Sequence, residues 1–298
     1  MADASSPRLL RDGRLYIVFA ITLMGVMGVS SVSPAFPQIA EHFNLTSRRV
    51  GLLLTVFTVP GIALAPLLGF MSDRFGRKRI VVPALLTYGV AGVACTVAPT
   101  FPVLLVLRFF QGAGAASLTS LSVTLLGDLY SGTTRERAVG YNAGALSIGT
   151  ASFPVIGGAL ASFGWRYAFT LPLIAVPVGL LVVFMLETPR VDGDGGDGGV
   201  RAVLANARRE GIVALSGLAV LVFILLYGAY LAYMPFVLRN RFDSPPALIG
   251  LIMSTMSIAT AVVSSQRGGA AVPASRAMNR GGAGAAPIPS AHRRGARE

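Results

Sequence analysis

The chain has 298 residues, of which 53% are hydrophobic and only 13% are charged, and its formal net charge is +12. A single water-soluble core cannot bury so large a share of apolar side chains, so the composition excludes a soluble globular domain and indicates an integral membrane protein. The one cysteine, Cys95, and the widely separated His42 and His292 provide neither a disulfide nor a pair of metal ligands. We therefore expect no metal, no cofactor and no enzymatic site.

Eight apolar segments have about the 20-residue length that crosses a bilayer core of roughly 30 Å. They predict an all-α integral membrane protein, a multi-spanning helical bundle with a six-helix N-terminal half and the first two helices of a second half. The predicted spans are 15–37, 50–71, 80–98, 102–127, 140–162, 166–186, 211–234 and 247–264. The predicted regions are a cytoplasmic N-terminus (1–14), the six-helix bundle (15–187), a cytoplasmic linker (188–210), a partial second bundle (211–265) and a low-complexity tail (266–298).

Arginine and lysine are distributed unevenly among the connectors. The N-terminus and the connectors 72–79, 128–139 and 187–210 carry thirteen of them, whereas the alternate connectors carry at most five. Positively charged connectors stay on the cytoplasmic side of a membrane. Because eight spans is an even number, we expect both termini to be cytoplasmic in a multi-pass protein of the cell membrane.

The most concentrated charge lies between spans two and three, in the stretch GFMSDRFGRKRI at residues 69–80. On charge alone, this cluster could be no more than a cytoplasmic anchor. The order of its residues, however, resembles G-x-x-x-D-R-x-G-R-[KR]-[KR], the signature loop of the major facilitator superfamily. The matching residues are Gly69, Asp73, Arg74, Gly76, Arg77, Lys78 and Arg79.

The resemblance implies that Asp73 and its basic neighbours form a cytoplasmic gate whose ion pairs break when the gate opens. The residue types suit that role, since Gly69 would let a neighbouring helix approach closely and Gly76 would permit a tight turn. A second charge cluster in GDLYSGTTRERAVGY resembles another part of the same family. Its Asp128, Arg135 and Arg137 could share an ion-pair network with Asp73 and Arg77, or could be solvated loop charges.

Span four contains RFFQGAGAAS, which resembles the family pattern R-x-x-Q-G-x-G-A-A. An arginine inside a membrane costs several kcal/mol unless it finds water or a partner, so Arg108 with Gln111 is a candidate functional pair. Alternatively, Arg108 lies only about 9 Å from the outer end of the span and could extend its side chain outward. The Gly and Ala residues favour tight helix packing.

Span five resembles the antiporter signature G-x8-G-x3-G-P-x2-G-G, which in the family accompanies export in exchange for protons. Phe153 departs from this pattern, because the family has glycine there, and the departure weakens the inference of export. The matching positions are Gly140, Gly149, Pro154, Gly157 and Gly158.

In this family the first and fourth helices line the transport cavity, which by position implies a pathway on these two spans. Methionine and serine suit a pliable, mildly polar cavity, and they would also suit ordinary helix packing. A carboxylate deep in a span, the usual site for proton coupling, is not evident in the sequence. The implied pathway residues are Met24, Met27, Ser30, Ser31, Ser33, Arg108 and Gln111.

A shift of 199 residues relates the first two spans to the last two. It matches Phe43, Asn44 and Gly51 with Phe242, Asp243 and Gly250. The repeat does not continue into residues 266–298, which are rich in Gly, Ala and Arg. We interpret the chain as a truncated transporter whose tail reflects a change of reading frame.

Together these features predict a drug:proton antiporter of the multidrug efflux type, which exports a small, lipophilic drug or metabolite by alternating access, with protons as the candidate coupling ion. We expect a monomer in the lipid bilayer without a nucleic-acid partner. Two alternatives stay open. One is a non-transporting remnant of such a transporter, and the other is a facilitator of sugar or metabolite uptake.

Overall fold

A computed structural model describes residues 9–185, 218 and 221–259, without the side chains of Ile62, Ala63, Ala65, Pro66, Asp73 and Thr119. The described residues up to Ser257 belong to one compact unit, Met1–Ser257. The regular elements in the described part are all helical, and six segments there are long and apolar enough to cross a membrane. The protein is an all-α, multi-spanning membrane protein, as the sequence predicts.

The first span is built from three helical pieces. Helix α2 (Gly13–Ser30) begins at Asp12, whose carboxylate accepts a hydrogen bond from the Arg14 backbone N–H at 3.0 Å. The 3-10 turn η1 (Ser33–Ala35) and helix α3 (Phe36–Phe43) follow. Prolines at positions 34 and 37 cannot donate backbone hydrogen bonds, which favours this interruption. The first span thus runs to Phe43, beyond the predicted end at 37.

Helices α5 and α6 meet at a single residue. After α4 (Ser47–Val50), α5 extends over Leu52–Phe75 and α6 over Arg77–Ala94, continued by the 3-10 turn η2 (Cys95–Val97). Gly76 joins the helices with φ +93° and ψ 141°, a conformation that side chains rarely permit. The predicted connector 72–79 is therefore helical except at Gly76.

The next two helices are the longest in the described chain. Helix α7 covers Phe101–Leu129 and α8 covers Gly132–Ala161. Residues 132–139 of the predicted connector 128–139 are helical, because α8 begins at Gly132. Charged residues at 135–137 occupy its first turns, where a helix can project beyond the apolar layer and keep its backbone bonded. The 3-10 turns η3 (Trp165–Phe169) and η4 (Leu171–Ile174) then lead into α9 (Ala175–Met185).

The second half contributes a π-helix, η5 (Leu225–Tyr233), followed by α12 (Met234–Phe242) and a helix over Pro246–Ala259. Most of the connector predicted at 235–246 is thus helical as well. The backbone supports the internal repeat: Asn44 ends α3 with φ 51° and Asp243 ends α12 with φ 46°. These are the non-glycine residues with positive φ in the described chain, and they are equivalent in the repeat. The predicted linker (188–210) and tail (266–298) lie outside the described residues.

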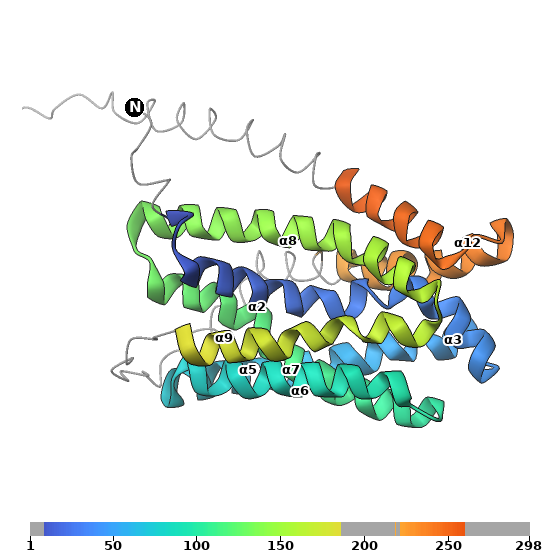
Figure 1. The fold of residues 1–298 in the computed structure, drawn as a ribbon, viewed down its shortest axis with the longest axis horizontal. Helices are drawn as coiled ribbons and strands as arrows, with labels where there is room; N and C mark the ends of the chain where they lie inside the picture. Colours follow the sequence, from blue (N-terminus) through green and yellow to red (C-terminus); the bar gives the residue numbers. More distant parts are fainter. Residues whose placement is uncertain (1–8, 186–217, 219–220, 260–298) are drawn as a thin grey trace, which may run out of the picture. The chain divides into compact units, whose positions relative to one another are not determined.

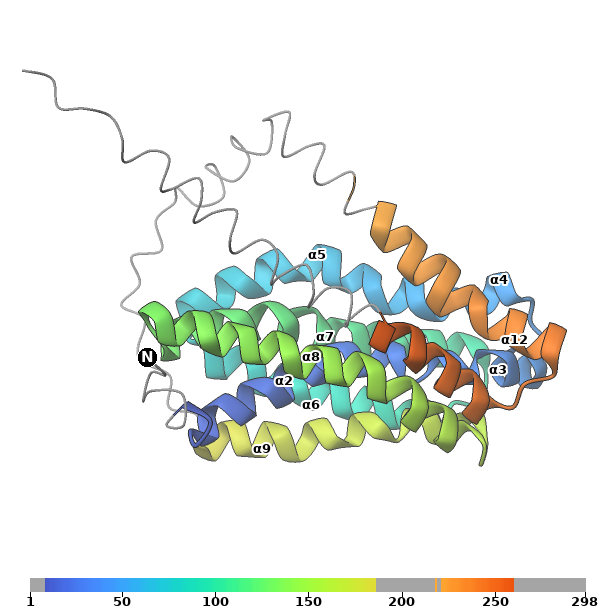
Figure 2. The ribbon, with the colours of Figure 1, turned by 90° about the horizontal axis from the view of Figure 1, so that it is seen from above.

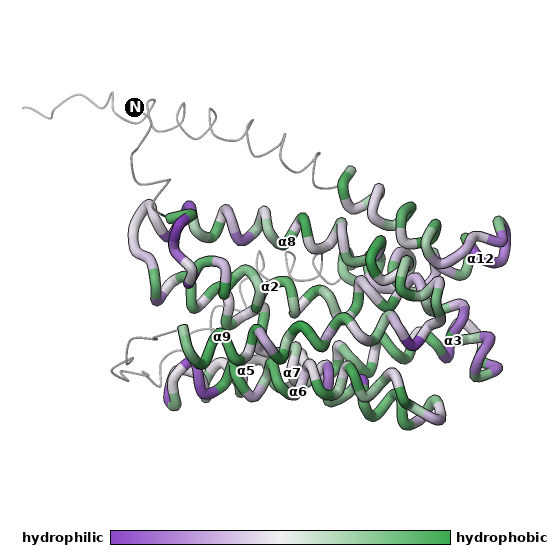
Figure 3. The backbone as a smooth tube through the Cα atoms, in the orientation of Figure 1, coloured by the Kyte–Doolittle hydropathy of each residue, from purple (hydrophilic) through white to green (hydrophobic). Residues whose placement is uncertain are grey.

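Helices α2 and α5 to α9 run alongside one another (Figures 1 and 2). Helix α7 packs against both α5 and α6, and α2 packs against α7 and α8. Glycine sets the closest approach, since a Cβ placed on Gly112 would collide with the backbone carbonyl of Phe57 in α5. On Gly114 it would lie 2.6 Å from the carbonyl oxygen of Ala84 in α6. Hydrophilic stretches gather mostly toward helix ends, as at α3 (Figure 3).

We expect Gly112→Ala to lower the free energy of unfolding by about 1–3 kcal/mol, because the added methyl group must push α7 away from α5. Gly144→Ala in α8 is the matched control, since no heavy atom lies within 4 Å of the added Cβ and alanine is the better helix former. Thermal unfolding of the purified proteins in detergent provides the measurement. Equal unfolding temperatures for both variants would contradict the close packing of α7 on α5.

Candidate functional site

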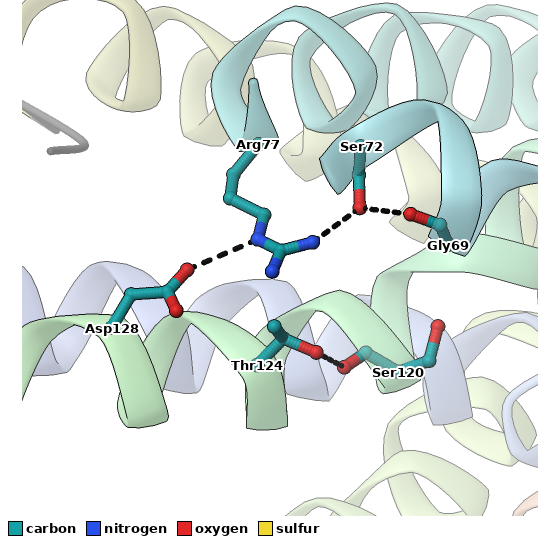
Figure 4. Close-up of polar contacts among 6 residues, drawn as sticks. All are labelled: Gly69, Ser72, Arg77, Ser120, Thr124 and Asp128. Carbon is teal, nitrogen blue, oxygen red and sulfur yellow. Dashed lines mark hydrogen bonds and ion pairs between the residues drawn. The ribbon is translucent and has the colours of Figure 1, made fainter. Parts of the chain in front are cut away.

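The charged turn, which we define as residues 69–79, is joined to Asp128 by a chain of three hydrogen bonds (Figure 4). Arg77, the first residue of α6, donates from Nε to Oδ2 of Asp128 at 3.0 Å. Its Nη1 donates to Oγ of Ser72 at 2.6 Å, and Ser72 in turn donates to the Gly69 carbonyl at 2.7 Å. One guanidinium therefore connects the end of α5, the start of α6 and the end of α7.

The ion pair in this chain also compensates two unfavourable helix dipoles. Asp128 lies in the last turn of α7, where the partial charge of the helix is negative, and Arg77 lies at the positive N-terminal end of α6. Each charge neutralises the other. The side chains of Arg77 and Asp128 are only 9% and 27% exposed, so the pair is less screened by solvent than a surface pair.

The other residues of the charged turn have separate surroundings. Gly76 makes the expected turn. The neighbouring helix expected at Gly69 is not found among the described residues, because an added Cβ there would meet no heavy atom within 4 Å. Lys78 donates to the carbonyl of Val183 near the end of α9, whereas Arg74 and Arg79 are exposed. The side chain of Asp73 lies outside the described residues.

The second charge cluster joins the charged turn through Asp128. This is the Arg77–Asp128 part of the ion-pair network that the sequence predicts. Arg135 lies beside the same helix end, since a Cβ on Gly127 would be 3.1 Å from its Nη2 atom. Arg137 is half-buried in the second turn of α8.

Sequence reasoning missed one contact at this end of the bundle. Tyr130, which follows α7, donates its hydroxyl hydrogen to Oδ2 of Asp12 at 2.7 Å and so ties α7 to the start of α2. Burial raises the pKa of the Tyr130 phenol, and the hydrogen bond to the Asp12 carboxylate raises it further. The two residues are 118 positions apart in the sequence, so their contact is set by tertiary packing alone.

Arg108 lies fully buried inside the N-terminal bundle. Its Nη1 donates to the Gly28 carbonyl at 2.9 Å and to Oε1 of Gln111 at 2.8 Å. The rings of Phe57 and Phe169 pack on the guanidinium, with centroids 4.9 and 5.3 Å from Cζ. The alternative in which Arg108 extends outward is therefore wrong. The Gly28 carbonyl lies in the last turn of α2, where such groups lack a helical partner.

The serine and methionine positions of the implied pathway are buried in helix contacts. Ser31 donates to the Met27 carbonyl at 2.7 Å, and its backbone lies where a Cβ on Gly157 of α8 would fall. Ser33 donates to the carbonyl of Leu231 in η5. Met24 and Ser30 are likewise buried. In this structure, these side chains pack α2 and η1 against their neighbours.

The antiporter-like residues of α8 contact both halves. Gly157 packs on α2, whereas a Cβ on Gly158 would collide with the Pro246 carbonyl of the second half. A Cβ on Gly250 would likewise collide with the Pro154 carbonyl. Of the remaining signature residues, Gly149 packs against Leu23, Gly140 has no heavy atom within 4 Å of an added Cβ, and Phe153 packs against the apolar core.

An ion pair also joins the halves. Arg239 in α12 contacts Oε1 of Glu41 in α3 at 3.4 Å, and its Nη1 contacts Oδ1 of Asp243 at 2.9 Å. The Glu41–Arg239 contact was not identified from the sequence, because a spacing of 198 residues carries no local signal.

The fold and the charged turn together define a multi-spanning helical membrane protein. The chain belongs to the Major Facilitator Superfamily, whose family model matches residues 18–289.

Among curated proteins, the chain is 32% identical over 200 residues to the MFS-type efflux pump MMF1 of Pseudozyma antarctica, covering 64% of this chain and 36% of the pump. It is 32% identical over 157 residues to the bacillibactin exporter of Bacillus subtilis, covering 50% of this chain and 39% of the exporter. The chain thus spans less than two fifths of the length of these relatives.

Solved structures show the same fold. One of them is a bacterial homologue of the human lysosomal transporter Spinster in an inward-facing and unoccupied conformation. The match covers 86% of this chain and 60% of the homologue, with a TM-score of 0.70 and 19% sequence identity. A D-xylose-proton symporter matches 82% and 65% of the two chains with a TM-score of 0.64 at 19% identity.

We expect Asp128→Asn to lower the free energy of unfolding by about 1.5–3 kcal/mol, because it removes the charge partner of a guanidinium that is largely buried. Arg79→Gln is the matched control, since Arg79 is exposed on the same turn and its loss should cost less than about 0.5 kcal/mol. Unfolding in detergent measures both. A double-mutant cycle with Arg77→Gln should give a coupling above about 0.5 kcal/mol, and additive losses would contradict the ion pair.

The raised pKa of Tyr130 predicts a loss of stability in alkali. A raised pKa means that folding favours the neutral phenol, so this contribution is complete below the unfolded pKa of about 10 and falls as the pH rises above it. The unfolding temperature of the native chain relative to Tyr130→Phe should therefore decrease between pH 9 and pH 11 or so. A constant difference over that interval would contradict the Asp12–Tyr130 contact.

Proposed function

We propose that this protein is a secondary active transporter that exports small molecules by alternating access, with the charged turn as its cytoplasmic gate. The observation that carries the proposal is the Arg77–Asp128 pair, because it joins the superfamily signature to the second charge cluster. The relatives named as efflux pumps and exporters support the direction of transport.

Alternating access needs two places that close in turn. Helix α5 has 24 residues, so its ends lie roughly 36 Å apart. The charged turn lies at its C-terminal end, whereas α3 and α4, just before its N-terminal end, contact α12 and η5 of the second half. In the proposed cycle, the Glu41–Arg239 and Gly158–Pro246 contacts close the outer end while the charged turn regulates the inner end.

The remaining properties follow from the resemblance and the charge distribution. We propose a lipophilic substrate and protons as the coupling ion. We also propose a monomer in the cell membrane, with six spans in the first half, two in the second and both termini in the cytoplasm. Arg108 and Gln111 are the proposed polar residues of the pathway. The likeness to the xylose symporter concerns the fold alone.

Cells that produce the chain should retain less of a lipophilic fluorescent dye than cells with an empty vector. Asp128→Arg should abolish the difference, because it places two like charges where the ion pair forms. Arg166→Gln in the exposed part of η3 is the control and should retain export. If the native chain is present in the membrane at normal amounts and dye retention equals that of the vector, the non-transporting alternative is favoured instead.

A further inference from the structure

The guanidinium of Arg108 uses only part of its hydrogen-bonding capacity. Nη1 makes both of its bonds, to the Gly28 carbonyl and to Gln111. Nε and Nη2 are buried and have no hydrogen-bond partner among the described residues, and neither does Nε2 of Gln111. Three buried donor groups are thus unpaired in one place, and unpaired buried donors are costly.

The two unused nitrogens of Arg108 form one edge of the planar group. Nε–H and Nη2–H point in parallel, which is the arrangement that binds both oxygens of a carboxylate. The rings of Phe57 and Phe169 already pack on the guanidinium. A carboxylate bonded at this edge would lie in the plane of the guanidinium, and apolar groups attached to it would lie near the same aromatic rings.

Charge also favours an anion at this edge. Described aspartate and glutamate residues occur at or beyond helix ends, as Asp12, Glu41, Asp128, Glu136 and Asp243 do. Arg77 and Arg239 each form an ion pair with a carboxylate, whereas the partners of Arg108 among the described residues are a carbonyl, an amide and two aromatic rings. Arg108 therefore carries a buried positive charge that carbonyl and amide oxygens and aromatic rings compensate only in part.

We propose that the Nε–Nη2 edge of Arg108 binds the carboxylate of the substrate, so that the transported molecules include amphiphilic carboxylic acids. This inference rests on the proposed function, since it names the substrate class of the same pathway. Binding at this edge would also act on the first span, because Nη1 of the same side chain holds the last turn of α2.

The chain contains its own reporter for a direct test. Trp165 is the single tryptophan, and its ring meets that of Phe169 edge-on at 6.0 Å, while Phe169 packs on Arg108. Cyclohexanecarboxylate should change the Trp165 fluorescence of the purified chain in detergent with saturation. It should also raise the unfolding temperature by about 3 °C at ten times its dissociation constant. The neutral amide of the same acid should do neither.

Two substitutions and a control identify the site. Gln111→Glu places a carboxylate beside the guanidinium, so it should raise the unfolding temperature and weaken cyclohexanecarboxylate binding at least tenfold. Arg108→Lys keeps the charge but loses the paired donors, and it should weaken binding similarly. Arg166→Lys changes an exposed arginine next to Trp165 and should bind as the native chain does.

Several results would overturn the proposal. They are an absence of response in the folded native chain, an equal response to the amide, and undiminished binding by a folded Gln111→Glu variant. An equal response to chloride or sulfate would show a site for small inorganic anions only and would also overturn it. Because binding is measured without transport, this inference and the proposed function can fail separately: export of dye with no carboxylate binding removes only the former.

Discussion

The hydrocarbon core of a membrane offers no water to polar groups, and this constraint determines where the chain can bend, break and carry charge. Continuous helices satisfy most of their own backbone, so the long elements α5 to α8 need outside partners mainly at their ends and next to interior prolines such as Pro83 and Pro154. Where the first span is interrupted after Ser30, the carbonyl of Gly28 needs a donor, and Arg108 supplies it. The break in one helix and the buried charge in another therefore depend on each other.

Helix α7 occupies the centre of these relationships. Its glycines at positions 112 and 114 allow the backbones of α5 and α6 to approach closely. Between them and the helix start lies Arg108, which contacts three other elements through Gly28, Phe57 and Phe169. At the far end Asp128 binds the charged turn. A movement of α7 along its axis would disturb the buried arginine and the largely buried Arg77–Asp128 ion pair together, which gives one rigid element influence over both candidate sites.

Patterns local in sequence predicted much of this arrangement. Hydropathy located the six described segments that are long and apolar enough to cross a membrane, and the signature at 69–79 identified both the turn at Gly76 and the charge cluster that binds Asp128. Helix ends were less predictable: α8 begins at Gly132 because a helix can continue into water on charged residues, which a hydropathy window excludes. The partners of Arg108 and Tyr130 were beyond reach, since they are 80 and 118 residues away and depend on which helices pack together.

The internal repeat shows how two similar units can form an unsymmetrical junction. Asn44 and Asp243 end α3 and α12 with the same left-handed conformation, so the backbone obeys the repeat. The side chains do not. Arg239 corresponds to Ala40 and Glu41 corresponds to Asn240, so a symmetry-related copy of the Glu41–Arg239 pair cannot form. Asp243 can also orient Arg239 with its carboxylate, a charge that Asn44 lacks. The backbone thus repeats between the two halves, whereas the Glu41–Arg239 contact between them depends on side chains that differ at equivalent positions.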